Sequence, residues 1–181
     1  MPKLSEKAWK IQLNSLNKLI DLLPKEYTMV EVGSYAGHSS WIFAKRAKFI
    51  TCVDPWIDQD WNKIYKITLA PSFWTAPMLE VEIDFDNRMK EFKNFKKLKT
   101  ISIEASKFFE NNSLDFVYID AIHTYDSVKE DITLWLPKIK KGGCIGGHDY
   151  SKAWSGVVKA VHETLRKPDY VFEDCSWLVK L

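Results

Sequence analysis

The sequence of 181 residues has few cysteines, no long apolar run and little excess of either charge. Its three cysteines, Cys52, Cys144 and Cys175, are odd in number and far apart, so we expect small buried side chains and no disulfide framework. Nowhere do about 18 apolar residues follow one another, as a transmembrane helix requires. The formal net charge of +2 does not by itself point to nucleic acid.

The N-terminal segment Met1–Lys10 also lacks the apolar core of a signal peptide, so we expect a cytoplasmic protein with no membrane attachment. The length of the chain fits one domain, residues 1–181. Apolar residues recur at helical spacing over Leu4–Leu23, and Pro24 ends this pattern. We therefore predict an N-terminal helix within residues 1–24.

Beyond this helix, short apolar runs alternate with helical patterns. We predict strands at Thr28–Val32, Phe49–Val53, Leu98–Ile103, Leu114–Ile119 and Cys144–Gly147, and helices at His38–Ala47, Ala105–Glu110, Tyr125–Leu136 and Trp154–Arg166. The last two runs, Tyr170–Glu173 and Ser176–Leu181, lie so close together that only an antiparallel hairpin can join them. The pattern predicts an α/β fold: a Rossmann-like, mainly parallel seven-stranded sheet with helices on both faces and a C-terminal antiparallel hairpin.

Two segments depart from the alternation. Residues 55–80 are rich in aromatic side chains and interrupted by prolines, which indicates an insertion that acts as a lid or covers one sheet edge. Lysine and arginine gather over Arg88–Lys99, with Phe92 and Phe95 between them at helical spacing. We predict a solvated helix face there in preference to a phosphate-binding patch.

The segment from Met29 to Ser40 places a strand, a tight turn with Gly33 and Gly37, and a helix start in succession. A ligand can approach the backbone closely at such a turn. Asp54 ends the next strand, about 20 residues later, where a carboxylate can accept hydrogen bonds from ribose hydroxyls. The Gly-x-x-x-Gly spacing fits a dinucleotide poorly, because the third glycine is missing. Glu31, buried in its strand, favours a ligand that carries positive charge.

The second half of the chain puts polar side chains after two further strands. Asp120 and His123 follow one strand, and His148 and Asp149 follow the next. Ligands of open α/β sheets bind at the carboxyl ends of the strands, so all four residues are candidates for a site.

These motifs resemble those of the class I S-adenosylmethionine-dependent methyltransferases, whose first motif is matched by Glu31-Val32-Gly33 and Gly37. The second half is similar to a branch of small-molecule O-methyltransferases related to the macrolide-sugar enzymes. The segments that carry this likeness are Ile119-Asp120-Ala121-Ile122-His123-Thr124-Tyr125, Trp135-Leu136-Pro137, Lys140-Lys141-Gly142-Gly143 and His148-Asp149-Tyr150.

The resemblance implies the cofactor S-adenosylmethionine and a set of residues around it. The turn would hold the methionine part, Asp54 the ribose, and Ser106, with Glu104, the adenine. The cofactor-binding residues predicted in this way are Glu31, Gly33, Ser34, Tyr35, Gly37, Ser39, Asp54, Ser106 and Asp120.

In that branch the carboxylates at both strand ends bind a divalent cation, here Mg²⁺ or another divalent metal at Asp120, Asp149 and His148. His148 stands where many relatives have an aspartate, and an imidazole weakens a Mg²⁺ site or favours a softer metal. The alternative is that these carboxylates only hydrogen-bond the turn and the cofactor. Of the predicted catalytic residues, His123, Asp120 and His148, we expect His123 to act as the base and His148 to be its rival.

The predicted function is O-methylation of a small hydroxylated, sugar-like metabolite. Alternatives are a protein that binds S-adenosylmethionine without turnover, a nucleic-acid methyltransferase, and an NAD-dependent oxidoreductase. The sequence lacks the Asn/Asp-Pro-Pro-aromatic signature of enzymes that methylate base amino groups, so nucleic acid is the less favoured substrate. A second copy of the chain could complete the pocket in a homodimer.

Overall fold

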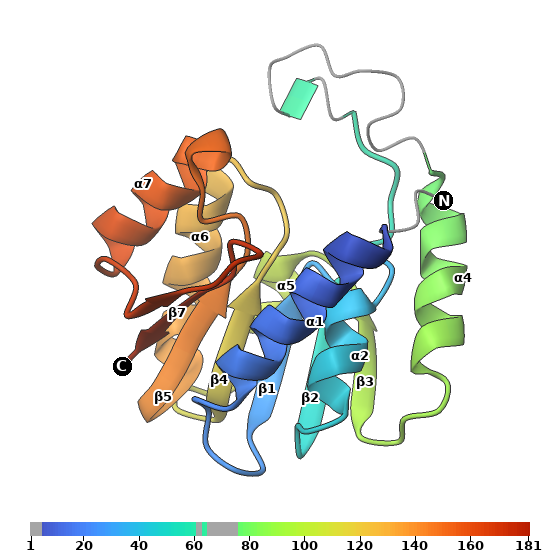
Figure 1. Cartoon of the computed structure of the whole chain (residues 1–181), viewed down its shortest axis with the longest axis horizontal. Helices are drawn as coiled ribbons and strands as arrows, with labels where there is room; N and C mark the ends of the chain where they lie inside the picture. The colour runs from blue at the N-terminus through green and yellow to red at the C-terminus, as the bar shows by residue number, and fades with distance from the viewer. Residues whose placement is uncertain (1–4, 61–62, 65–75) are drawn as a thin grey trace.

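The computed structural model describes residues 5–60, 63–64 and 76–181, in which helices and strands alternate along the chain (Figure 1). The helices are α1 Glu6–Ile20, α2 His38–Ala44, α4 Met78–Met89, α5 Ser102–Ser106, α6 Tyr125–Trp135 and α7 Ser155–Thr164, with short 3-10 turns at Leu136–Lys138 and Lys152–Trp154. The strands are β1 Thr28–Val32, β2 Phe49–Asp54, β3 Phe95–Lys99, β4 Leu114–Ile119, β5 Ile139–Gly147, β6 Tyr170–Val171 and β7 Trp177–Lys180.

The seven strands form one sheet in the order β3-β2-β1-β4-β5-β7-β6. The first five strands in this order are parallel to one another, and β7 is antiparallel to both β5 and β6. This confirms the predicted Rossmann-like sheet and its C-terminal hairpin. Val32 pairs with Val53 on one side and with Ile119 on the other, so β1, β2 and β4 end at the same edge of the sheet.

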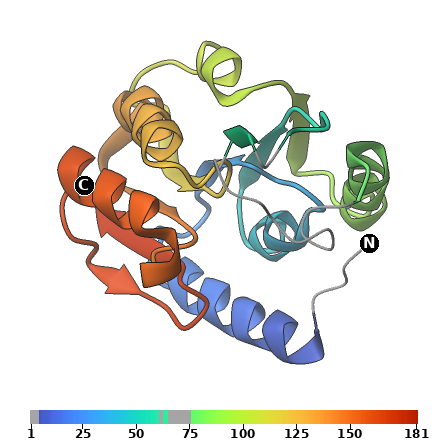
Figure 2. The ribbon, with the colours of Figure 1, turned by 90° about the horizontal axis from the view of Figure 1, so that it is seen from above.

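Helices cover both faces of the sheet because β1, β2 and β4 are apolar on both sides. One buried layer joins α1, α2 and α4 to the sheet through side chains such as Leu16, Phe43 and Phe85. The other layer joins α6 and α7 through side chains such as Ile132 and Val161. Figure 2 shows these two groups of helices on opposite sides of the strands. Among the described residues, no helix combines the length and the apolar character needed to cross a membrane.

The prediction was wrong in the region from α4 to α5. Helix α4 was missed, and the basic segment Arg88–Lys99 is not a helix, because it runs from the end of α4 through a turn into β3. The side chain of Asn94 holds this turn by donating to the carbonyl oxygens of Ala44 and Ala47, and β3 pairs with β2. Pairing with the sheet thus overrides the helical spacing of the two phenylalanines.

The strand predicted at Leu98–Ile103 is displaced in the structure, where β3 ends at Lys99 and α5 occupies Ser102–Ser106. A charged edge strand has little apolar pattern, so the more apolar residues that follow it looked like the strand. The helix predicted at Ala105–Glu110 is correspondingly too late.

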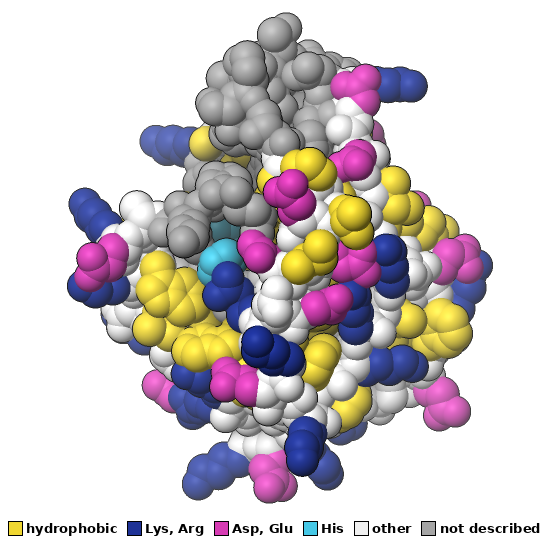
Figure 3. Space-filling model, turned by 90° about the vertical axis from the view of Figure 1, so that its right-hand side faces the viewer, with side chains coloured by type: hydrophobic (Ala, Val, Ile, Leu, Met, Phe, Trp, Pro, Cys, Tyr) yellow, Lys and Arg dark blue, Asp and Glu magenta, His cyan; other side chains and the backbone are white. Residues whose placement is uncertain are grey.

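Acidic and basic side chains alternate on the face that carries α4 and β3, with apolar side chains between them (Figure 3). Lys97, for example, pairs with Glu82 and Asp86, and Lys99 pairs with Glu82. Within the described residues, this edge of the sheet therefore presents no patch of purely positive charge.

The predicted insertion and the three cysteines are described only in part or differ in burial. Of the insertion predicted at residues 55–80, residues 61–62 and 65–75 lie outside the described residues, so the lid stays a prediction. At its beginning, Trp56 is buried and packs against Phe85 of α4, with ring centroids 4.9 Å apart. Cys52 and Cys144 are buried as expected, whereas Cys175 is only partly buried.

Candidate functional site

A cavity of about 610 Å³ opens at the carboxyl ends of β1, β2, β4 and β5. Its volume lies within the range of about 300–1,000 Å³ that is usual for small-molecule sites. Of the residues predicted from the sequence, the cavity is lined by Gly33, Ser34, Tyr35, Ser39, Asp54, Asp120, His123, His148 and Asp149, and not by Glu31, Gly37 or Ser106. The parallel strands thus bring residues from four separate segments to one place.

The glycines of the turn have left-handed backbone angles, with φ of +90° at Gly33 and +76° at Gly37. A Cβ on Gly33 would lie 2.1 Å from the carbonyl oxygen of Asp120, and one on Gly37 would lie 2.9 Å from the ring of Phe85. From the sequence, we attributed these glycines to the close approach of a ligand to the backbone. The structure gives a different reason, because the neighbouring strand end and α4 already occupy the space of a side chain.

Glu31 lies beneath the turn, fully buried, and does not reach the cavity. The hydroxyl of Ser34 donates to its Oε2 at 2.8 Å, and the hydroxyl of Ser40 donates to the same oxygen. Burial raises the pKa of Glu31 to about 7, against the opposing effect of hydrogen bonds from Ser39, Ser40 and Ser34. The serine hydroxyls and the raised pKa thus offset part of the cost of burying this carboxylate, and its predicted role toward a cationic ligand stays a prediction.

Asp54 lines the cavity and also holds the backbone around it. Its two carboxylate oxygens accept hydrogen bonds from the backbone amides of Tyr35 at 2.9 Å and Trp56 at 2.8 Å. Both of these residues have left-handed backbone angles, with φ of 46° and 45°. The indole of Trp56 donates to the carbonyl oxygen of Tyr35 at 2.9 Å, which closes the link between the two loops. Asp54 therefore stabilises two strained positions at the edge of the cavity.

Ser106 is placed away from the cavity, where its hydroxyl donates to the carbonyl oxygen of Ile103 at 2.9 Å within α5. The cavity wall thus gives no support to its assignment to adenine, which stays a prediction. The residues between β3 and α5 that do line the cavity are Thr100, Ile101, Ser102 and Ile103.

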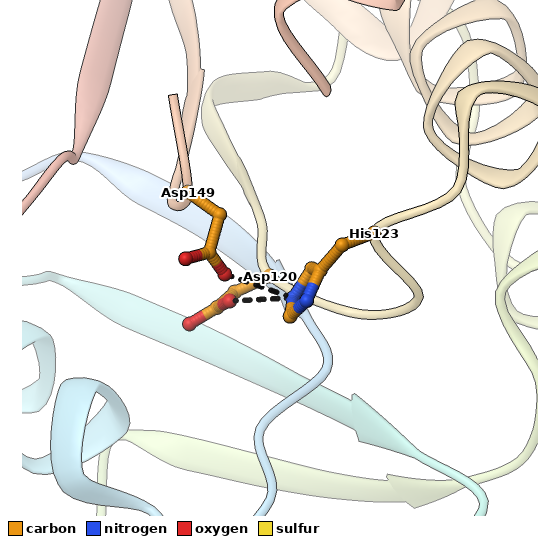
Figure 4. A group of neighbouring side chains, drawn as sticks. All are labelled: Asp120, His123 and Asp149. Atoms are coloured by element: carbon orange, nitrogen blue, oxygen red, sulfur yellow. Dashed lines mark ion pairs between the residues drawn. The ribbon is translucent and has the colours of Figure 1, made fainter. Parts of the chain in front are cut away.

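Four titratable side chains meet at the ends of β4 and β5. Nε2 of His123 lies 3.4 Å from Oδ1 of Asp120 and 3.1 Å from Oδ2 of Asp149 (Figure 4). Nδ1 of His148 lies 3.4 Å from Oδ2 of Asp149 and 3.9 Å from Oδ1 of Asp120. Asp149 has a left-handed backbone angle, with φ of 60°, which aims its carboxylate back at the imidazoles.

Protonation in this group is set by the two carboxylates. Burial favours neutral imidazoles, but the negative charges of Asp120 and Asp149 outweigh it and raise the pKa of His148 to about 9. The same carboxylates raise the pKa of His123 against burial and against the charge of His148. Despite burial, the two histidines lower the pKa of Asp149. His148 is therefore protonated at neutral pH, which makes it a poor acceptor of a further proton.

The donor atoms that converge enough to hold a metal belong to Asp120, His123 and Asp149, all within 4.8 Å of one another. The metal set predicted from the sequence contained His148 in place of His123, and it stays a prediction, because His148 also lies near both carboxylates. Two carboxylates and one imidazole suit divalent cations such as Mn²⁺ better than Mg²⁺, which prefers oxygen alone.

Two of the cavity residues that sequence reasoning missed lie on the side of α6 and α7. Trp154 lies beside His123, with ring centroids 4.9 Å apart, although the sequence marked it only as a helix start. Asp131 of α6 is buried and lines the cavity, and burial raises its pKa to about 6. A carboxylate in the middle of an amphipathic helix gives no local signal, because only the packing of α6 on the sheet turns it inward.

Residues 30–150 match a family model described as a methyltransferase domain. No curated protein sequence matches this chain closely enough to be counted as a relative. Among solved structures, the fold is similar to that of the O-methyltransferase NovP, with a TM-score of 0.63 and 14% identity over 96% of this chain and 79% of that one.

The fold is also similar to that of the N-methyltransferase NodS from Bradyrhizobium japonicum WM9, with a TM-score of 0.63 and 14% identity over 97% of each chain. A third similar structure is phosphoethanolamine N-methyltransferase 1 from Haemonchus contortus, in complex with phosphoethanolamine and S-adenosylhomocysteine. Its TM-score is 0.56 at 11% identity over 79% of this chain, which spans only 27% of the length of that protein. At identities of 11–14%, the similarity between these structures and this chain concerns the fold alone.

Proposed function

The chain belongs to the methyltransferase-domain family, and from this premise we propose that it methylates a hydroxyl group of a small, sugar-like metabolite. It is an S-adenosylmethionine-dependent methyltransferase, and the proposal concerns its acceptor and its residues. The observation that carries the proposal is the group formed by Asp120, His123 and Asp149 in the wall of the cavity, beside the glycine turn.

The cofactor is proposed to lie along the cavity from the turn to the end of β3. Ser34, Tyr35 and Ser39 would surround its methionine part, and Asp54 would bind its ribose. Each oxygen of Asp54 accepts one backbone hydrogen bond and keeps a second lone pair for a ribose hydroxyl. S-adenosylmethionine supplies an electrophilic methyl group when bound.

The imidazole of His123 is proposed to take the proton of the acceptor hydroxyl. Asp120 and Asp149 would stabilise the resulting imidazolium, since their oxygens lie 3.4 Å and 3.1 Å from its Nε2. His148, already protonated, would add positive charge where the acceptor oxygen becomes negative. Because the pKa of His123 is raised, the rate of transfer should increase with pH as His123 loses its proton.

A divalent cation is the second candidate for activating the acceptor. Asp120, His123 and Asp149 would hold it, and it would supply a Lewis acid for the hydroxyl group. Two measurements separate these candidates. If a cation activates the acceptor, calorimetry should detect binding of Mn²⁺ to the wild type and its loss in Asp149→Asn. If His123 acts as the base without a metal, methyl transfer should continue in the presence of EDTA.

A small acceptor with hydroxyl groups fits the walls around His123. The ring of Trp154 lies beside it, and aromatic rings stack on the faces of sugars. Both signs of charge are present on the face that carries α4 and β3, which gives no support to a nucleic-acid substrate (Figure 3).

The proposal is tested by incubating the protein with methyl-labelled S-adenosylmethionine and a panel of hydroxylated acceptors, RNA and DNA. We expect label in a small acceptor, together with binding of S-adenosylhomocysteine and none of NAD. Cofactor binding without transfer to any compound, with or without Mn²⁺, would instead indicate a binding protein. Label in RNA or DNA alone would overturn the proposed acceptor.

A further inference from the structure

His38, the first residue of α2, lines the cavity directly after the glycine turn. Its imidazole is held by two other helices. Trp9 of α1 packs against the ring, with centroids 5.7 Å apart, and the guanidinium of Arg88 in the last turn of α4 lies 3.1 Å from Nε2. Arg88 is anchored in turn because its Nε donates to the carbonyl oxygen of Ala36 at 3.0 Å. Three helices thus fix one side chain of the cavity wall.

The contact with Arg88 decides which nitrogen of His38 carries the proton. A guanidinium has donors only, so Nε2 must accept, and the hydrogen of the neutral ring is assigned to Nδ1. Burial and the positive charge of Arg88 lower the pKa of His38 to about 4, which keeps the ring neutral at physiological pH. Within the described part of the chain, no acceptor takes a hydrogen bond from Nδ1–H.

The charges of the cavity indicate what this donor meets. Five of the described lining residues are acidic, namely Asp54, Asp120, Glu130, Asp131 and Asp149, and none is lysine or arginine. The carboxylate of an amino-acid ligand would be repelled by these five groups. The protonated imidazole of His148 also lines the cavity, but it lies between Asp120 and Asp149, whose negative charges offset its own. At His38 the ligand carboxylate would meet an N–H group backed by the guanidinium of Arg88, which polarises the ring and strengthens the donor.

We propose that His38, backed by Arg88, binds the carboxylate of the methionine part of S-adenosylmethionine through its Nδ1–H. This assignment rests on the proposed function, because it requires the methionine part to lie over the turn that precedes His38. The proposal adds a cofactor-binding residue to the motif formed by Glu31-Val32-Gly33 and Gly37. It also gives a reason for the contact between Arg88 of α4 and the first residue of α2.

The test compares two ligands that differ only in this carboxylate, S-adenosylhomocysteine and its decarboxylated analogue, by calorimetry. We expect His38→Phe to weaken binding of S-adenosylhomocysteine by about tenfold or more, as for a hydrogen bond to a charged group. Binding of the analogue should change little. His38→Asn keeps an N–H group close to the position of Nδ1 and should retain most of the affinity.

Arg88→Met should also weaken S-adenosylhomocysteine selectively, whereas Arg46→Met, an exposed arginine that pairs with Asp21 beyond the other end of α2, should not. No loss in His38→Phe, or equal losses for both ligands, would overturn the assignment. Unchanged cofactor binding with a raised KM for the acceptor would place the carboxylate on the acceptor and overturn it too. A wild-type protein that binds neither ligand would contradict the proposed function itself.

Discussion

The ends of β1 and β2 and the ends of β4 and β5 face the same cavity, but the fold uses their carboxylates differently. Asp54 and Glu31 are buried and accept short hydrogen bonds from backbone amides or serine hydroxyls. Asp120 and Asp149 remain partly exposed and contact imidazoles at 3.1 to 3.9 Å, the longer of which are ion-pair distances only (Figure 4).

This difference separates two tasks. Buried carboxylates that accept internal hydrogen bonds fix the shape of the backbone, and their removal should reduce stability or cofactor binding. Carboxylates that share protons with imidazoles can change their charge during a reaction. Removal of Asp120 or Asp149 should therefore reduce the rate of turnover.

The largest expected effect is that of Gly33→Ala in the first region. The new Cβ would meet the carbonyl oxygen of Asp120 at 2.1 Å, so the variant should lose about 3 kcal/mol or more of unfolding free energy. Gly142→Ala is the matched control, since its φ is +79° but nothing lies within 4 Å of a Cβ. It should lose about 1 kcal/mol, from backbone strain alone. Equal losses in urea unfolding would show that the close approach to Asp120 is not what requires glycine.

The second effect should appear in turnover. His123→Gln removes the proposed base, so the rate of methyl transfer to the acceptor found in the panel should fall about 100-fold. His162→Gln, on the exposed side of α7, should leave the rate unchanged. If His123→Gln kept the wild-type rate but lost as much unfolding free energy as Gly33→Ala, the ends of β4 and β5 would serve stability and not turnover, contrary to the proposed difference.

The third effect concerns the pH dependence of stability at Glu31. Its pKa is about 7 in the folded protein against an ordinary value of 4.5, so the folded state binds the proton more tightly. The stabilisation is complete below about pH 4.5 and is lost as the pH rises through about 7.

Glu31→Gln resembles the protonated form and should not show this loss. Between pH 4.5 and 7 the wild type should lose on the order of 2 kcal/mol of unfolding free energy relative to the variant. Parallel stability curves for the two proteins over this range would contradict the raised pKa.

The smallest effect is expected for Asp54→Asn. An amide can accept only one of the two backbone hydrogen bonds, from Tyr35 or from Trp56, and its NH₂ group would face the other donor. Binding of S-adenosylhomocysteine should weaken about tenfold by calorimetry. Asp58→Asn is the control and should bind normally, because the carboxylate of Asp58 accepts one hydrogen bond, from the amide of Met78 at the start of α4.

The parts of the fold that were predicted correctly depend on local signals. The apolar runs of β1 and β4 are recognisable because both faces of a central parallel strand are buried, and the turn at Gly33 and Gly37 needs left-handed backbone angles. The parts that were missed depend on distant contacts. Strand β3 is charged and mostly half exposed, and it is a strand because β2 offers it hydrogen bonds.

The site divides in the same way. By itself, the sequence determined that Asp54 stands at the end of one strand and that Asp120, His123, His148 and Asp149 follow two others, and parallel strands must end at one edge of a sheet. Only the tertiary structure decided which of their atoms meet. It placed His123 closer than His148 to both carboxylates. It also paired Glu31 with serines beneath the turn and brought Arg88 to His38 from 50 residues away. Strand order follows from a pattern along the chain, but hydrogen-bond partners depend on packing between elements, which no local pattern encodes.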